Sequence, residues 1–336
     1  MELKYIFSVN AATGIIETPD NYIVFISRGI LFLDKKSHKE IYCTNDFCDP
    51  DDGKVTPDSK YLVVRNAKNG FYCYDLKSRK QLSKAIFGEA VEVNYLGFCY
   101  SLDGKSMYAL IATPKDQSIP PLGNEDYINN TTVELRHYEL PSLKLLDTLP
   151  CKEKYMTIKP VKFLNGCVLT SVGNHLSFFD GKAIVDYPST KTSNYEVLVD
   201  EKKEQFYSQT DFGVKIYNKQ FQDTNILDLI SDSEVVVNDT LYNYLNMDPG
   251  SAMNTPAATK TVFKEKILDL YLIDDKIVLL AAECLQRYSK ISVYDTSKGK
   301  PLAEFKMNCY TNQIFNLNKG VAFLVKGDIY VLEMQD

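Results

Sequence analysis

The sequence predicts an all-β protein, a single β-propeller most simply read as seven four-stranded blades. Three observations lead to this fold class: a strand motif that returns seven times, a regular interval between its copies, and turn signals between them. Repeats of about 40 residues that each hold four short strands are typical of propeller blades. A closed all-β fold often uses a chain of 336 residues as one domain, so we expect one domain over residues 1–336.

The recurring motif is a strand of β-branched and aromatic residues that closes on Asp, Asn or Glu. Its copies are GILFLD (29–34), GFYCYD (70–75), VELRHYE (133–139), HLSFFD (175–180), GVKIYN (213–218), KISVYD (290–295) and DIYVLE (328–333). These residue types suit a pleated, half-buried surface, so each copy is predicted to be a strand. The motif endings lie 41, 64, 41, 38, 77 and 38 residues apart. Four of the six intervals therefore match one blade.

The remaining strands of each blade are predicted from turns. An apolar strand follows each of the turns TPDNY (18–22), TPDSKY (56–61), SLDGKSMY (101–108) and IDDK (273–276). Pro presets φ in such a turn, and Asp or Gly supplies the tight bend, so a hairpin is expected before the motif. A second turn follows the motif, as in DTSKGKPLAEF (295–305), and leads to a fourth strand.

The two long intervals predict insertions. Residues 113–131 are rich in Pro and Asn, which indicates a long loop within the third blade. Residues 231–266 extend the other interval to two periods, so this segment is either an insertion, the reading we favour, or a degenerate eighth blade.

The two ends of the chain predict how the ring closes. Only Met334, Gln335 and Asp336 follow the last motif copy, so the last blade lacks its outer strand. The segment LKYIFSV (3–9) is a strand without a blade at the other end. Pairing the two would close the ring and remove free sheet edges, which otherwise invite aggregation.

These turns and strand endings resemble the superfamily of WD-repeat-like and YVTN-like β-propellers. The resemblance rests on turns such as SLDGKSMY and strand ends such as ISVYDTSKGKPL, and it extends over nearly the whole chain. It implies the propeller fold and no particular activity. The chain has no Trp, and therefore no Trp-Asp dipeptide, and no Gly-His pair precedes the blades. It thus resembles a divergent member, in which the hydrogen-bonded tetrad of WD repeats is not expected.

Composition excludes several classes of partner. The formal net charge is −6 without a basic block, so we expect no nucleic acid binding. Residues 1–9 lack the features of a signal peptide, and no apolar run approaches the ~20 residues of a membrane span. The eight cysteines are scattered through strand-like segments, which favours reduced thiols. We therefore expect a cytoplasmic protein without a membrane partner, and a monomer by itself.

Local motifs for chemistry are missing from the sequence. The three histidines, His38, His137 and His175, are not spaced as metal ligands, and no Cys-x-x-Cys occurs. Residues 49–53 (DPDDG) match only the opening of a calcium loop and are interpreted as a polar turn between blades. The sequence contains neither a Gly-x-Ser-x-Gly elbow nor a Gly-rich phosphate loop. It predicts no metal, no cofactor and no catalytic residue.

One pattern of charges indicates a binding face. In a propeller, the turns between the second and third strands of all blades lie on the same face. The cations expected in these turns come from five blades and are Arg28, Arg65, Lys68, Lys115, Arg287 and Lys326. The insertion 113–131 adds Tyr127, a residue type that often anchors interfaces. Such a face would attract an acidic partner, although exposed turns also collect Lys and Arg for solvation alone.

Two function hypotheses follow. The first is a non-catalytic interaction platform that binds a protein or peptide, including an acidic one, on the face carrying the insertions and cations. The alternative is a propeller enzyme or small-ligand binder, similar to the lactonases, with its site at the mouth of the central channel. The second hypothesis predicts a deep polar pocket with carboxylates of shifted pKa, and a channel filled by apolar side chains would argue against it.

Overall fold

The structure, a computed structural model, describes most of the chain. The described residues are 1–44, 50–66, 70–87, 94–115, 131–151, 161–170, 175–188, 190, 197–210, 213–229, 235–237, 261–263, 266–282, 289–297, 301–307, 309–311 and 313–334. Within them the secondary structure consists of strands and turns, without a helix. None of the described segments is therefore a helix long and apolar enough to cross a bilayer.

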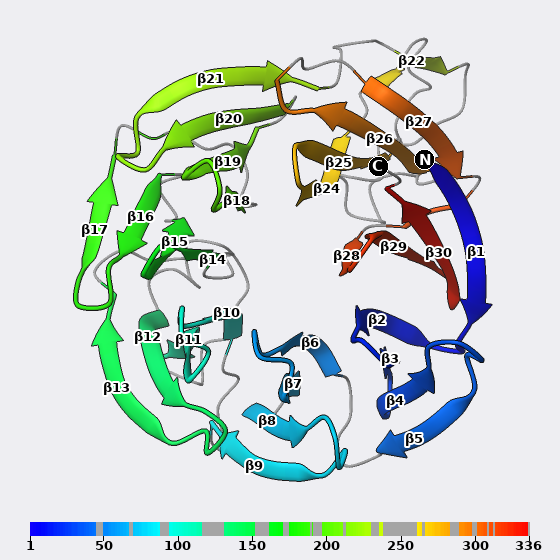
Figure 1. Cartoon of the computed structure of the whole chain (residues 1–336). Helices are drawn as coiled ribbons and strands as arrows, with labels where there is room; N and C mark the ends of the chain where they lie inside the picture. Colours follow the sequence, from blue (N-terminus) through cyan, green and yellow to red (C-terminus); the bar gives the residue numbers. More distant parts are fainter. Residues whose placement is uncertain are drawn as a thin grey trace, which may run out of the picture.

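Seven four-stranded antiparallel sheets form a ring around a central channel (Figure 1). Blades 1 to 3 consist of β2 (Ala12–Glu17), β3 (Asn21–Ile26), β4 (Gly29–Asp34) and β5 (Glu40–Thr44); β6 (Pro50–Val55), β7 (Tyr61–Asn66), β8 (Gly70–Asp75) and β9 (Gln81–Ile86); and β10 (Asn94–Tyr100), β11 (Ser106–Pro114), β12 (Thr131–Glu139) and β13 (Leu145–Pro150). In each blade the strands follow one another from the channel outward (Figure 1).

Blades 4 to 6 repeat this order. They consist of β14 (Val161–Phe163), β15 (Gly166–Thr170), β16 (Leu176–Phe179) and β17 (Ile184–Tyr187); β18 (Val197–Asp200), β19 (Gln205–Gln209), β20 (Gly213–Asn218) and β21 (Asp223–Asp228); and β24 (Lys266–Ile273), β25 (Lys276–Ala282), β26 (Ser289–Asp295) and β27 (Pro301–Met307). Between blades 5 and 6 the structure describes only the short two-stranded sheet of β22 (Val235–Val237) and β23 (Thr261–Phe263). The propeller therefore has seven blades, as predicted.

Blade 7 closes the ring with both ends of the chain. It consists of β28 (Ile314–Leu317), β29 (Gly320–Val325), β30 (Asp328–Glu333) and, as outer strand, β1 (Glu2–Ser8). β1 pairs antiparallel with β30, so that Leu3 lies opposite Leu332 and Phe7 opposite Ile329. The predicted closure by the N-terminal strand is confirmed.

The recurring sequence motif forms the third strand of every blade, and in blades 1, 2 and 4 the Asp that ends it anchors the turn to the outer strand. Asp34 Oδ1 accepts a hydrogen bond from the backbone N–H of Ser37 (2.7 Å), and Asp75 Oδ1 does the same for Ser78 (2.6 Å). These bonds favour the charged carboxylate and lower the pKa of both side chains. An Asp at this position is thus explained by turn geometry.

The hydrophobic core is divided into seven clusters, one between each pair of neighbouring blades. The cluster between blades 7 and 1 contains Phe7 from β1 together with Ile15 from β2 and Ile329 from β30. Each sheet thus buries both of its faces, which explains why the third strands carry nearly continuous apolar runs.

One interpretation of the sequence is wrong. Residues 50–53 were expected in a turn between blades, whereas β6 already begins at Pro50. A β-bulge between Pro50 and Asp52 interrupts the pairing of this inner strand with β7. Such bulges admit one extra residue and tolerate Pro and Asp in a strand, so a turn-like composition does not exclude a strand here.

Candidate functional site

The structure describes four of the predicted binding cations. Arg28 lies exposed in the β3–β4 turn, Lys326 lies exposed in the β29–β30 turn, and Lys115 follows β11. Arg65 is half-buried within β7, opposite Asp52 and Phe71 in the sheet. All four lie at the end of the blade where the second strand passes into the third. Since every blade has the same strand order, these ends share one face of the ring, which we call the groove face.

Three predicted residues, Lys68, Tyr127 and Arg287, lie outside the described residues. Of the four described cations, Lys326 alone lines a pocket among those described in the structure. The candidate site is therefore built around Lys326.

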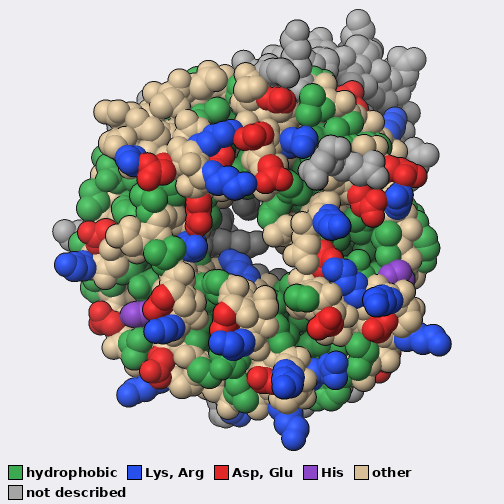
Figure 2. Space-filling view, in the orientation of Figure 1, with side chains coloured by type: hydrophobic (Ala, Val, Ile, Leu, Met, Phe, Trp, Pro, Cys, Tyr) green, Lys and Arg blue, Asp and Glu red, His purple; other side chains and the backbone are tan. Residues whose placement is uncertain are grey.

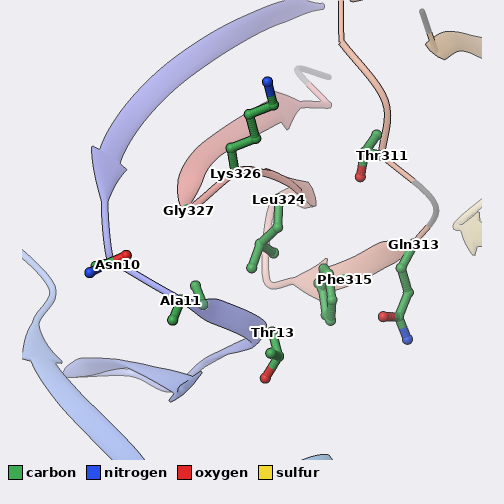
Figure 3. A pocket seen from close by; sticks show the side chains of 10 residues that line it. Asn10, Ala11, Thr13, Thr311, Gln313, Phe315, Leu324, Lys326 and Gly327 are labelled. Carbon is green, nitrogen blue, oxygen red and sulfur yellow. The ribbon is translucent and has the colours of Figure 1, made fainter. Parts of the chain in front are cut away.

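A pocket of about 570 Å³ lies on the groove face where blades 7 and 1 meet, and we call it the closure groove (Figure 3). Its lining comes from both ends of the chain: Asn10, Ala11, Ala12, Thr13, Thr311, Gln313, Phe315, Leu324, Lys326 and Gly327. In Figure 3, Leu324 and Phe315 lie between Lys326 on one side and Thr13 on the other. The groove thus has an apolar centre and polar ends.

The first wall of the groove is the segment from β1 to β2. The Val9 N–H donates to the Gly327 carbonyl at 2.8 Å, which fixes this segment to the β29–β30 turn. Ala11 turns the chain with a φ of 58°, and the Ala12 N–H donates back to the Val9 carbonyl at 3.3 Å. A Cβ on Gly327 would lie only 2.6 Å from the Val9 carbonyl oxygen, so glycine is required for this close approach.

The second wall is the segment that leads from blade 6 into β28. The Ser289 side-chain oxygen accepts a hydrogen bond from the Thr311 N–H (2.9 Å) and donates one to the Thr311 carbonyl (3.1 Å). Asp269 Oδ2 accepts a hydrogen bond from the Ile314 N–H at 2.6 Å. These three bonds hold the segment to blade 6, so the groove exists before any partner arrives.

The floor is apolar. Phe315 and Leu324 are half-buried and pack against the core cluster between blades 7 and 1. The Phe315 ring also approaches Gly14 of β2, where a Cβ would lie 3.4 Å from the ring. The buried side of each residue is thus held by the core, while the other side faces the groove.

The charge of the groove is carried by Lys326. In the part of the chain that the structure describes, its ammonium makes no ion pair. Asp328, two residues further on, accepts a hydrogen bond from the Ser8 hydroxyl. Burial raises the pKa of the nearby Cys309 thiol, and the charge of Lys326 opposes this effect. Lys326 is therefore the exposed cation of the groove lining, and in Figure 3 its side chain points away from Leu324 and Phe315.

The central channel holds a second pocket, of about 670 Å³, lined by residues from blades 2 to 7. Gln313 lines both this pocket and the closure groove, so the groove face and the channel meet at this side chain. The channel is hollow, and its lining mixes apolar residues such as Val197 and Leu270 with Lys54, Lys162 and Asp269.

The two lysines and the aspartate that line the channel already have partners. The Lys54 ammonium donates to the Phe98 carbonyl and lies 4.9 Å from the centre of the Phe98 ring. Lys162 pairs with Glu201 at 3.0 Å, and Asp269 is held by backbone N–H groups. Burial raises the pKa of Tyr271 to about 12, so its phenol remains protonated at neutral pH and can donate a hydrogen bond.

Elsewhere, many surface charges are compensated locally. Figure 2 shows one face of the ring, where Lys and Arg side chains alternate with Asp and Glu around the central opening. Representative pairs are Lys203 with Asp275 (2.5 Å) and Lys60 with Asp58 (2.9 Å). The described His, Cys, Asp and Glu side chains form no group of three or more suited to a metal ion.

Comparison with solved structures identifies the type of fold. The chain is similar to the β-propeller domain of Cps50 (Swd1) from Myceliophteria thermophila, with 9% sequence identity and a TM-score of 0.66 over 99% of this chain and 100% of that domain. It is also similar to the WD40 repeats of RRP9 (9% identity, TM-score 0.64, 99% and 97% covered) and to U3-55K (9%, 0.63, 99% and 98%). The fold is that of WD40 propellers. The propeller fold implied by the resemblance in the sequence is thereby confirmed.

The comparisons of sequence alone gave no relative. No protein-family model matches the chain, and no curated protein matches it either.

Lys326 is the one residue of the groove lining that the sequence predicts as a binding residue. Asn10, Thr13 and Gln313 carry no motif, and Phe315 and Leu324 look like ordinary strand residues. The useful signal was the predicted ring closure, because it brings the residues after β1 next to the turn before β30. Combining the closure with the turn positions would have pointed to this junction.

Proposed function

We propose that this protein is a non-catalytic interaction platform that binds a protein or peptide partner on the groove face. The closure groove carries the proposal: it is preformed, hollow and half apolar, and it presents an available ammonium. A rigid ring that displays turns from seven blades suits binding, since binding residues are commonly placed on loops held by a rigid scaffold. The partners that Lys54, Lys162 and Asp269 already have in the channel favour this reading over a catalytic one.

The proposal extends to an acidic partner. Arg28 and Lys326 are both exposed on the groove face, and neither makes an ion pair within the described part of the chain. Cations of this kind raise association rates with an acidic partner and make them sensitive to salt. We expect the interaction to involve the monomer and to take place in the cytoplasm, which are expectations from the sequence.

Charge reversal on the two faces tests the proposal. The tagged full chain would be used for affinity capture from its native lysate, followed by mass spectrometry. The double variant Arg28→Glu/Lys326→Glu should lose a partner that wild type retains at low salt. The matched control is Lys39→Glu/Lys319→Glu, because Lys39 and Lys319 are exposed in turns of the same two blades on the opposite face.

Two results would contradict the proposal. One is equal capture by both double variants and wild type, which would remove the groove face from consideration. The other is saturable binding of a small molecule in a thermal-shift screen that is lost in Lys54→Ala, which would favour the channel.

A further inference from the structure

From the geometry of the closure groove we infer its ligand class: an extended peptide segment that carries a carboxylate next to an apolar side chain. This inference rests on the proposed function and specifies what the groove face recognises. Its three components are the charge at Lys326, the apolar floor of Phe315 and Leu324, and the amide side chains of Asn10 and Gln313.

The charge selects a carboxylate. Lys326 is the one cation among the residues that line the groove. A single ammonium matches one negative charge, whereas a phosphate group carries close to two and is commonly bound by Arg forks or clusters. Asp328 accepts the Ser8 hydroxyl and makes no ion pair with Lys326 in the described part of the chain.

The floor selects an apolar neighbour. Phe315 and Leu324 are only half-buried although both belong to an inter-blade cluster, so each leaves apolar surface exposed to the groove. In Figure 3 Leu324 lies next to Lys326 and Phe315 lies nearer to Thr13, while the Lys326 side chain points away from both. Lys326 carries its ammonium on a flexible four-carbon stem, so it can turn toward a carboxylate whose neighbouring side chain lies over this floor.

The polar side chains on the two walls of the groove suit a peptide backbone. The side chains of Asn10 and Gln313 each offer both a hydrogen-bond donor and an acceptor, which is what a peptide unit requires. Thr13 Oγ1 makes only long contacts of 3.4 Å with the Phe25 and Pro50 carbonyls, which leaves its acceptor capacity available. These groups stand on two fixed walls, so binding costs little ordering of the protein.

Pools of acetylated, amidated hexapeptides with one fixed dipeptide test the inference directly. Fluorescence polarisation would compare the pools Leu-Glu, Leu-Gln, Ser-Glu and Leu-phosphoserine against the full chain. We expect the Leu-Glu pool to bind about tenfold more tightly than either Leu-Gln or Ser-Glu. Equal binding of Leu-Glu and Leu-Gln, no binding of any pool, or tighter binding of Leu-phosphoserine would each overturn the inference.

Variants of Lys326 assign the effect to the groove. Lys326→Gln should reduce Leu-Glu binding about tenfold, and Lys326→Glu should reverse the preference to a Leu-Lys pool. Lys319→Gln, in the opposite turn of the same blade, should leave binding unchanged. An equal loss in both Gln variants would contradict a role of the groove. Failure of the peptide assay while charge reversal still abolishes partner capture would refute the ligand class and leave the proposed function standing.

Discussion

Blade 2 and blade 7 have the same four antiparallel strands in the same order, but they are assembled from different parts of the chain. Blade 2 is continuous from Pro50 to Ile86, whereas blade 7 joins β1 (Glu2–Ser8) to β28–β30 (Ile314–Glu333). Blade 2 can form from neighbouring residues, while blade 7 requires the two ends to meet, which costs more chain entropy. The closure groove lies beside the blade that depends on this meeting, so its geometry depends on closure.

The largest expected effect comes from removing one buried aromatic ring from each of the two blades and comparing the results. Phe71→Ala in blade 2 and Phe7→Ala in β1 should each destabilise the protein by about 3–5 kcal/mol, because both rings are buried in inter-blade clusters. Chemical denaturation measures this loss. Hydrogen exchange should differ: Phe7→Ala should expose the amides of β1 and β30 by local opening, since no chain connection holds β1 to β30.

Phe71→Ala should instead raise exchange across the protein, through global unfolding. Identical exchange patterns in the two variants would show that blade 7 is as cooperative as blade 2, and the contrast between them would be lost.

A smaller effect concerns the contact that fixes the first wall of the groove. Gly327 and Gly181 have nearly the same positive φ, 92° and 95°, in turns of blades 7 and 4. A Cβ at Gly181 would have its nearest neighbour at 3.9 Å, whereas one at Gly327 would lie 2.6 Å from the Val9 carbonyl. Gly181→Ala should cost roughly 1–2 kcal/mol from φ strain alone, and Gly327→Ala roughly twice that. Thermal unfolding gives both values.

Gly327→Ala should also weaken peptide binding to the groove, while Gly181→Ala should leave it unchanged. If the two variants lose the same stability and bind the peptide equally well, the approach of Val9 to Gly327 does not shape the site.

The smallest effect is a pH dependence that blades 1, 2 and 4 have and blade 7 lacks. Asp34, Asp75 and Asp180 accept backbone hydrogen bonds in turns to outer strands, and these bonds lower the pKa of each carboxyl. A folded-state pKa below the unfolded value stabilises the protein above the ordinary Asp pKa of about 3.9, and this stabilisation is lost as the pH falls through the lowered folded-state pKa.

NMR titration of the three carboxyl carbons should therefore give midpoints below those of exposed Asp residues, and Asp75→Asn should flatten the decline of Tm below pH 4. Blade 7 has no chain between β30 and β1, and therefore no such turn. Midpoints at ordinary values would show that these turns are not held by the charged form.

The fold was largely predictable because its signal is local and repeated. The motif from Gly29 to Asp34 returns as the third strand of each blade, and its Asp is dictated by the turn that follows. The closing role of residues 3–9 was also predictable, since a lone strand at one end matched a missing one at the other. The start of β6 was not, because Pro50 and Asp51 resemble a turn and only the bulge accommodates them in a strand.

The site was predictable only in part. Turn position was enough to place Lys326. Which of the predicted cations lines a pocket depends on which turn borders the closure groove. Contacts between segments distant in sequence decide this. Gln313 and Phe315 become groove residues because Ser289 and Asp269 fix the segment around them. No sequence pattern near Gln313 or Phe315 indicates these contacts.

The pairing of Glu2 with Glu333 has a consequence for the connectivity of the ring. Because the two termini belong to adjacent strands, a short linker could join them, and the chain could be opened at another turn, such as residues 35–39 between β4 and β5. Such a circular permutant would have a covalently continuous blade 7, and blade 1 would become the blade assembled from both ends. The blade that opens most easily would thus be determined by where the polypeptide is interrupted, and not by the ring itself.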